Sequence, residues 1–321
     1  MRVVVIGGMG HIGRFLVGQL WEDGHEVIVV SSGRSPAPRE PGWDKVQCVT
    51  GRYAREGAPW KTFLAGLRPE VLVDIIDDAD HHLQIDLRGT YEAVRGTLKH
   101  YLFCGSVWMF GAPVCVPAPE IPVGEALCPG YVTRFRELQE LFVVARQSGP
   151  PLTAIMPPNL CGPGRIPLDC KGTESIELHR AHARGEPVFL PEGINTLIEP
   201  CDVSDVAQGF RLAVRNRDAA ANEMFNVGAP YALTFPQFVR AYAEIHGVAI
   251  PIEYVSSERF FGDIVPDPVD AAHFRHHMCP DVTKISRALG YRPQFTCEQA
   301  MARAVEWMWH EGILARNART L

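Results

Sequence analysis

The chain has 321 residues, of which 46% are hydrophobic and 21% charged, and its formal net charge is -6. This composition excludes a disordered polypeptide, and an acidic balance without a basic block argues against binding of nucleic acid through a broad positive face. No apolar run approaches the roughly 20 residues of a membrane-spanning helix, and the N-terminus enters a strand at once, so we expect a cytoplasmic protein that handles small molecules.

The first predicted strand, Val3 to Ile6, runs directly into a glycine-rich turn. Four consecutive apolar residues suit a strand that is buried on both faces of a parallel sheet. The glycines of GGMGHIG follow, and apolar residues then recur at helical spacing, which places the turn between a strand and a helix N-terminus. This arrangement predicts a dinucleotide cradle, in which we expect the cofactor to contact Gly7, Gly10, His11, Ile12 and Gly13.

The second predicted strand, Glu26 to Val30, ends in Ser31, Ser32, Gly33 and Arg34. Sites that prefer NAD usually place an acidic residue here, whereas hydroxyls and an arginine suit a ribose 2′-phosphate. We therefore predict NADP rather than NAD, with Ser31, Ser32 and Arg34 as ligands. The alternative is that Arg34 only begins a solvated, proline-rich loop.

The remaining N-terminal elements alternate between helix and strand. A strand at 46–49 is followed by Arg52, which either extends the phosphate-binding wall or is a plain surface residue. A strand at 71–76 ends beside Ile76 and Asp77, which we expect at the cofactor edge, and the polar stretch after it is either a helix cap or part of the site. With helices near 60–67 and 83–98 and a strand at 101–104, the order predicts an α/β fold with a doubly wound parallel Rossmann sheet.

The order of these motifs resembles that of the extended short-chain dehydrogenase/reductase family, the NAD(P)-dependent epimerase/dehydratase group. The resemblance rests on GGMGHIG, VVSSGR, VLVDII, KHYLFCGSVWMFG, MPPNLCGPG, CDVSDVA and FNVG, and it covers nearly the whole chain. The SSGR end and the aspartate in VLVDII look closest to an atypical branch with plant chloroplast RNA-binding relatives. The resemblance implies a Rossmann domain over residues 1–164 with returns near 200–228, an interleaved substrate-binding cap over residues 165–321, and a homodimer.

In that family a tyrosine exchanges a proton with the substrate, a lysine one helical turn later supports it, and a serine or threonine bonds the reacting oxygen. The resemblance implies that Ser106 and Tyr131 hold the serine and tyrosine positions. The lysine position, however, is Phe135. Arg134 and Arg136 flank it, each rotated by about 100° around the helix, and Arg134 is kept as a candidate catalytic helper.

The predicted substrate side lacks the cations of a nucleotide-sugar site. The segment GINTLIEPCDVSDVA carries Glu199 and Asp202 ahead of the family aspartate, Asp205, and no arginine. A buried diphosphate needs cationic partners, so we expect an uncharged or cationic small molecule instead. Asn159, in MPPNLCGPG, is a candidate at the boundary between cofactor and substrate.

A cluster of titratable residues lies late in the chain, at His273, His276, His277 and Cys279. This cluster either forms part of a pocket wall or has only a structural role, and we expect no metal site. The proline-rich loop APVCVPAPEIPVG is predicted to cover the substrate. Further elements are expected as a helix at 203–214, a strand at 224–227 and a closing helix at 297–309.

Three functions fit this pattern. The first is an NADP-dependent oxidoreductase or epimerase-like enzyme that acts on a small hydroxyl- or carbonyl-bearing metabolite through Tyr131 and Ser106. The second is a redox-neutral lyase, isomerase or cyclase on the same cofactor-binding fold. The third is a non-catalytic regulator that senses the cofactor or binds RNA, which the acidic charge disfavours.

Overall fold

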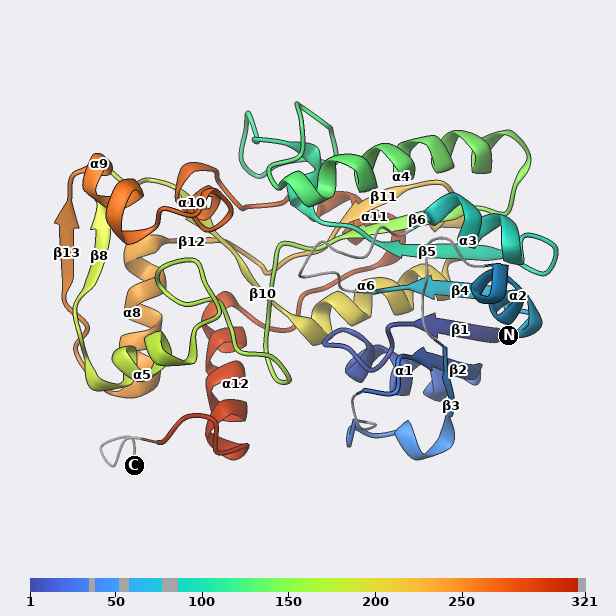
Figure 1. The fold of residues 1–321 in the computed structure, drawn as a ribbon, viewed down its shortest axis with the longest axis horizontal. Helices are drawn as coiled ribbons and strands as arrows, with labels where there is room; N and C mark the ends of the chain where they lie inside the picture. The colour runs from blue at the N-terminus through green and yellow to red at the C-terminus, as the bar shows by residue number, and fades with distance from the viewer. Residues whose placement is uncertain (35–37, 52–57, 77–85, 317–321) are drawn as a thin grey trace.

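A seven-stranded parallel sheet forms the N-terminal part of the molecule (Figure 1). The computed structural model describes residues 1–34, 38–51, 58–76 and 86–316. The strand order is β11-β6-β5-β4-β1-β2-β3, so the chain reverses direction across the sheet after β3 and winds it doubly. The strands are β1 (Arg2–Ile6), β2 (Glu26–Ser31), β3 (Gln47–Thr50), β4 (Val71–Asp74), β5 (His100–Cys104), β6 (Leu152–Met156) and β11 (Met224–Asn226).

Helices cover both faces of the sheet because its central strands are apolar on both faces. In β1, Val3 and Val5 pack into the core beneath α1 and α6, whereas Val4 and Ile6 pack into the core beneath α2, α3 and α4. This confirms the predicted fold class. The helices of this part are α1 (Gly13–Glu22), α2 (Ala58–Gly66), α3 (Leu87–Val94), α4 (Pro129–Ser148), α6 (Val203–Arg215), α7 (Arg217–Ala220) and α11 (Thr283–Leu289), with short turns η1 (Trp43–Lys45) and η2 (Val107–Phe110).

A separate hydrophobic core lies in the C-terminal unit, on the left of Figure 1. The chain enters this unit after β6 and returns to the sheet through α6 and β11, so the two parts are interleaved. The unit contains β7 (Asn159–Cys161), α5 (Ile176–Arg184), β8 (Val188–Pro191), β9 (Leu197–Ile198), β10 (Pro200–Asp202), β12 (Leu233–Thr234), α8 (Phe235–His246), β13 (Ile252–Val255), α9 (Ser257–Arg259), η3 (Phe260–Ile264), α10 (Pro268–Arg275) and α12 (Cys297–His310).

The core of this unit contains an unusual group of buried aromatic and histidine side chains. The rings of His179 and His182 lie 5.3 Å and 5.2 Å from the ring of Tyr242, and His246 stacks on Tyr242 at 6.4 Å. Burial lowers the pKa of all three histidines, to about 3 for His182 and about 4 for His246. The three rings are therefore neutral at pH 7 and pack as part of the core.

The strands predicted at 71–76 and 224–227 and the helix predicted at 83–98 extend beyond the observed β4, β11 and α3. The fourth strand ends at Asp74 rather than at residue 76, although the backbone N–H of Ile75 still donates to the carbonyl of Ile6 at 3.1 Å. The helix predicted from residue 83 is α3, which begins after Asp86, whose side chain caps it by accepting from the N–H of Gly89. Among the described residues, the helices are too short or too polar to cross a membrane.

Candidate active site

The turn between β1 and α1 has the backbone shape of a dinucleotide cradle. Gly7 has a φ of +81°, and a Cβ at this position would lie 2.9 Å from the carbonyl oxygen of Ile75. At Gly13, the first residue of α1, a Cβ would collide with the carbonyl of Gly8. Only glycine allows the turn to pass this close to β4 and to the helix, so the N–H groups of the first turn of α1 lie at the strand ends.

A cavity of about 310 Å³ lies beside this turn. The described residues that line this cavity include no carboxylate. Ser31 and Ser32 place hydroxyl groups at the end of β2. The walls of the cavity are Gly7, Met9, Gly10, His11, Ile12, Ser31, Ser32, Ile75, Ile76 and Leu160. The glycine turn, the helix N-terminus and the apolar walls fit the pyrophosphate and the adenosine of a dinucleotide.

Three predicted cofactor residues, Arg34, Arg52 and Asp77, are not among the described residues that line this cavity. Arg34 is exposed and lies two residues after Ser32 along the chain. Arg52 and Asp77 lie outside the described residues. Burial, followed by the charge of Arg165, lowers the pKa of His11 to about 4, so this imidazole is neutral at pH 7.

A larger cavity of about 490 Å³ lies next to the first. The two cavities share Ile12, Ile75, Ile76 and Leu160 as lining residues. The larger cavity brings together four residues that the sequence analysis singled out separately, which come from η2, α4 and β7. These are Ser106, Tyr131, Arg134 and Asn159.

The orientation of α4 explains how Arg134 reaches this cavity. With about 100° per residue, Arg134 and Phe135 lie on opposite sides of Tyr131, at about 60° and 40° from it. Phe135 turns into the core, where its ring meets the edge of Phe110 at 5.8 Å. The guanidinium of Arg134 instead lies over the ring of Phe103, with its Cζ 4.8 Å from the ring centroid. Its Nη2 donates to the carbonyl of Ile76 at 3.3 Å. A guanidinium is thereby held at the carboxyl end of β4, beside the cavity.

Ser106 and Asn159 present polar atoms to the same cavity. The Ser106 oxygen caps η2 by accepting from the N–H of Trp108 at 3.2 Å, so the hydroxyl hydrogen is free to be donated elsewhere. The Nδ2 of Asn159 is buried without a hydrogen-bond partner among the described residues. Buried donors are normally satisfied, and a bound ligand is one way to satisfy this one.

The C-terminal unit supplies the far wall of the larger cavity. Arg165 lies there, but its Nε is 2.8 Å from the carboxylate of Glu174, so its charge is compensated. Burial raises the pKa of Asp270 to about 6. Three of these wall residues were not predicted from the sequence, namely Asp270, Arg165 and Glu174. The one sequence feature that pointed to this wall is that Asp270 lies one helical turn before His273.

The late histidines do not form a common site. His273 lines the larger cavity and stacks against Trp108 at 4.6 Å, and burial lowers its pKa to about 3. His277 lies elsewhere, and its Nδ1 accepts from the N–H of Leu197 at 3.2 Å. Within the part of the chain that is described, no group of three or more potential ligands is placed to hold a metal ion. His273 is thus a wall residue of the cleft.

The CDVSDVA motif is structural in this fold. Asp202 caps α6 through the N–H of Ser204 at 2.9 Å, and its other oxygen pairs with the Nε of Arg303 at 2.9 Å. Asp205 accepts from the backbone N–H groups of Gln294 and Phe295 at 2.9 to 3.1 Å. These carboxylates join α6 to the segment that leads into α12 and do not line either cavity described above.

Comparison with known proteins agrees with this geometry. The model of the NAD dependent epimerase/dehydratase family matches residues 3–228. The 41 kDa chloroplast stem-loop binding protein b of Arabidopsis thaliana is 23% identical, over 99% of this chain and 82% of that protein. A 3-beta-hydroxysteroid dehydrogenase of Mycolicibacterium neoaurum is 24% identical, over 95% of this chain and 91% of that protein.

Among solved structures, a UDP-glucose 4-epimerase of Thermotoga maritima with UDP-glucose superposes with a TM-score of 0.73. Its sequence is 22% identical, and the match covers 98% of this chain and 100% of that one. This likeness establishes the fold. The names of the three proteins describe three different activities, so the chemistry of this chain has to be argued from the residues of the cleft.

Proposed function

This chain belongs to the NAD dependent epimerase/dehydratase family, and from that premise we propose that it is an NADP-dependent oxidoreductase or epimerase-like enzyme. Its substrate in this proposal is a small metabolite that carries a hydroxyl or carbonyl group. One observation carries the proposal. Ser106, Tyr131, Arg134 and Asn159 line a cavity that shares four wall residues with the cavity of the glycine cradle.

The cradle would hold the cofactor through Gly7, Gly10, Gly13 and the first turn of α1, with Ser31 at the adenosine end. A bound NADP supplies hydride transfer chemistry. The preference for NADP is supported by the serine hydroxyls and by the lack of a carboxylate among the described residues of the smaller cavity. The exposed Arg34, two residues after Ser32 along the chain, is the candidate partner of a 2′-phosphate.

The catalytic roles follow from the chemistry of the side chains. Tyr131 exchanges a proton with the substrate oxygen, and the hydroxyl of Ser106 donates a hydrogen bond to the same oxygen. Arg134 provides the positive charge that the family obtains from lysine, because it is the guanidinium that α4 directs to this cavity. Asn159 offers its unpartnered Nδ2 to an oxygen of the cofactor or the substrate.

The charge balance of the cleft supports a substrate without a diphosphate. Arg134 and Arg165 are the cationic groups among its described lining residues, and Arg165 is paired with Glu174. Asp270 adds a carboxyl group on the cap side. A diphosphate would find little uncompensated positive charge here, whereas a neutral or cationic molecule fits.

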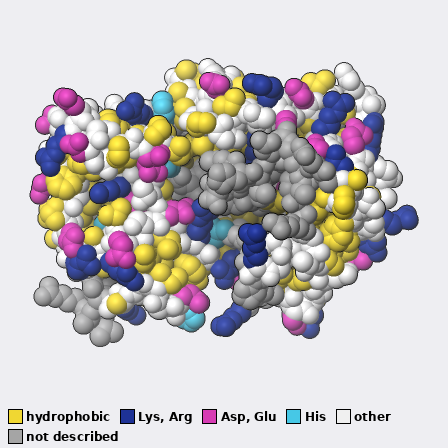
Figure 2. Space-filling view, viewed as in Figure 1, with side chains coloured by type: hydrophobic (Ala, Val, Ile, Leu, Met, Phe, Trp, Pro, Cys, Tyr) yellow, Lys and Arg dark blue, Asp and Glu magenta, His cyan; other side chains and the backbone are white. Residues whose placement is uncertain are grey.

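The replacement of lysine by Phe135 also supports a second candidate, a redox-neutral reaction on the same fold. An RNA-binding role has less support. On the face shown in Figure 2, acidic and basic side chains are interspersed, and the net charge is -6. The oxidoreductase candidate differs from the redox-neutral candidate in the net change in nicotinamide absorbance during turnover. An epimerase-like reaction returns its hydride to the substrate and differs from the redox-neutral candidate in the transient absorbance of the reduced cofactor.

The test begins with NADPH and NADH titrations, followed by a screen of small carbonyl compounds and alcohols for turnover. We expect tighter binding of NADPH, and we expect Tyr131→Phe to lower turnover by about 100-fold or more while NADPH still binds. Tyr231→Phe, at an exposed tyrosine in the C-terminal unit, is the matched control and should leave turnover unchanged. Full activity of Tyr131→Phe would overturn the proposed mechanism, and turnover without a net or a transient absorbance change would favour the redox-neutral candidate.

A further inference from the structure

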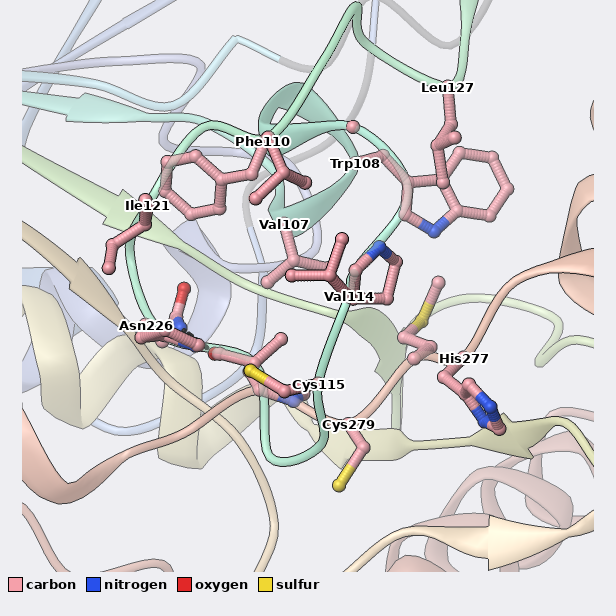
Figure 3. A pocket seen from close by; sticks show the side chains of 17 residues that line it. Val107, Trp108, Phe110, Val114, Cys115, Ile121, Leu127, Asn226, His277 and Cys279 are labelled. Atoms are coloured by element: carbon pink, nitrogen blue, oxygen red, sulfur yellow. Dashed lines mark hydrogen bonds between the residues drawn. The ribbon is translucent and has the colours of Figure 1, made fainter.

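A second, smaller cavity lies beneath the proline-rich loop that joins η2 to α4, apart from the cleft described above (Figure 3). Its volume is about 150 Å³. The walls are almost entirely apolar. Val107 and Phe110 come from η2, Ile121 and Leu127 from the loop, and Met278 and Pro280 from the segment after α10.

Asn226, at the end of β11, is the one amide in these walls, and it is 1% exposed. Its Nδ2 donates to the carbonyl oxygens of Ala118 at 2.9 Å and Asp281 at 3.4 Å. Because two carbonyl oxygens face this nitrogen, the opposite orientation of the amide would place oxygen against oxygen. The orientation of the side chain is therefore determined by its surroundings.

The Oδ1 of Asn226 has no hydrogen-bond partner within the described part of the chain. Figure 3 shows this oxygen pointing toward the side of the cavity where Phe110 and Ile121 lie. A buried acceptor without a donor is unfavourable, so a ligand that brings a donor to this point gains a hydrogen bond.

We propose that this cavity binds a small apolar molecule that carries one hydrogen-bond donor, with the size of a phenol. An apolar cavity of about 150 Å³ admits a molecule as large as benzene, which sets the size of the ligand. The walls select an apolar body, and Asn226 selects a hydroxyl or an N–H group.

The site is distinct from the catalytic cleft but touches it. Trp108 and Met278 line both cavities and therefore stand between them. On the cleft side, the ring of Trp108 packs against the ring of His273, and the two ring centroids are 4.6 Å apart. The proposal needs no assumption about the reaction in the cleft, and its failure would leave the proposed function untouched.

The experiment uses the full chain and fluorine NMR, with 4-fluorophenol and fluorobenzene as the two probes. The first binds through both the apolar walls and Asn226, and the second through the walls alone. We expect saturable binding of both, with 4-fluorophenol about tenfold tighter because of one additional hydrogen bond. Two outcomes would overturn the proposal, namely no saturable binding of 4-fluorophenol and equal affinity for the two probes.

Val107→Phe, which fills the cavity, should abolish binding of both probes. Val143→Phe is the matched control, because Val143 lies on α4 outside these walls and is 53% exposed. If Val107→Phe does not fold, Ile121→Trp takes its place, since Ile121 lines the cavity but is 58% exposed and tolerates a larger side chain. Unchanged binding of 4-fluorophenol in a folded filling variant would contradict the site.

Discussion

The edge of the sheet and the junction between α6 and the C-terminal unit use polar side chains in opposite ways. At the sheet edge, the Nδ2 of Asn159 and the Nε of Arg134 lack protein partners among the described residues and belong to side chains that line a cavity. At the junction, Asp202 and Asp205 are bound to backbone N–H groups or to Arg303. The comparison teaches that a polar residue in a family motif serves a ligand only where the fold leaves its polar atoms unpaired beside a cavity.

The largest expected effect comes from the cradle. Gly13→Ala places a methyl group against the carbonyl of Gly8, so α1 has to move away from β1. We expect NADPH affinity, measured by fluorescence titration, to fall by about 100-fold or more. Gly66→Ala is the control, because a Cβ there meets no atom within 4 Å, and it should leave NADPH affinity unchanged. Wild-type affinity in Gly13→Ala would refute the cradle.

The second prediction concerns the ion pair between Asp202 and Arg303. Arg303→Met leaves the fully buried Asp202 without its cationic partner, and we expect the free energy of unfolding to fall by about 3 kcal/mol. NADPH affinity should change little, since neither residue of this pair lines a cavity of the cleft. Arg217→Met breaks an exposed pair with Asp218 and should cost about 0.5 kcal/mol or less in urea unfolding. Equal losses in the two variants would remove the contrast between the regions.

A third effect concerns pH. His246 titrates near pH 6.5 in the unfolded chain and near pH 4 in the folded protein, because burial opposes its charge. Between these values the unfolded chain binds more protons, so stability falls as the pH drops from about 6.5 toward 4. His246→Phe should reduce this dependence by up to about 1.4 kcal/mol per pH unit in urea unfolding. His310→Phe, at an exposed histidine, should not change it, and an unaltered slope in His246→Phe would contradict the account.

The smallest effect concerns the choice of cofactor. Arg34→Ala removes the exposed guanidinium that follows the end of β2. We expect NADPH to bind about tenfold more weakly and NADH to bind almost as before, since only NADPH carries the 2′-phosphate. Titration of both nucleotides measures this directly. An equal loss for both would show that Arg34 acts on the fold or on a shared part of the cofactor.

The fold and the cradle could be predicted from the sequence because their signals are local. An apolar strand, closely spaced glycines and a helical repeat are all contained in residues 2–20, and the structure places them as β1, the turn and α1. The capping role of Asp202 also has a local signal, since an aspartate precedes an amphipathic helix. The domain boundary at residue 164, the homodimer and the roles of Arg52 and Asp77 stay predictions.

The sequence indicated Arg134 as a candidate helper, but the direction of its side chain could not be predicted, because it depends on how α4 rotates against the sheet. Sequence spacing places Arg134 about 100° from the lysine position, which suggests that it is misdirected. Packing of Phe135 against Phe110 rotates the helix so that position 135 enters the core and Arg134 reaches the cavity. Asp270 was not predicted as a wall residue for the same reason. Tertiary packing, and not the sequence of α10 alone, brings it to the cavity.

The central claim is that Arg134 replaces the family lysine, and the most direct measurement is the kcat of three variants on a substrate that the screen identifies. Arg134→Met should lower kcat by about 100-fold or more, and Arg134→Lys should recover part of that loss because it keeps the charge. Arg134→Met with Phe135→Lys should not recover it, since position 135 faces the core. Unchanged kcat in Arg134→Met, or full rescue by the lysine at 135, would contradict the account.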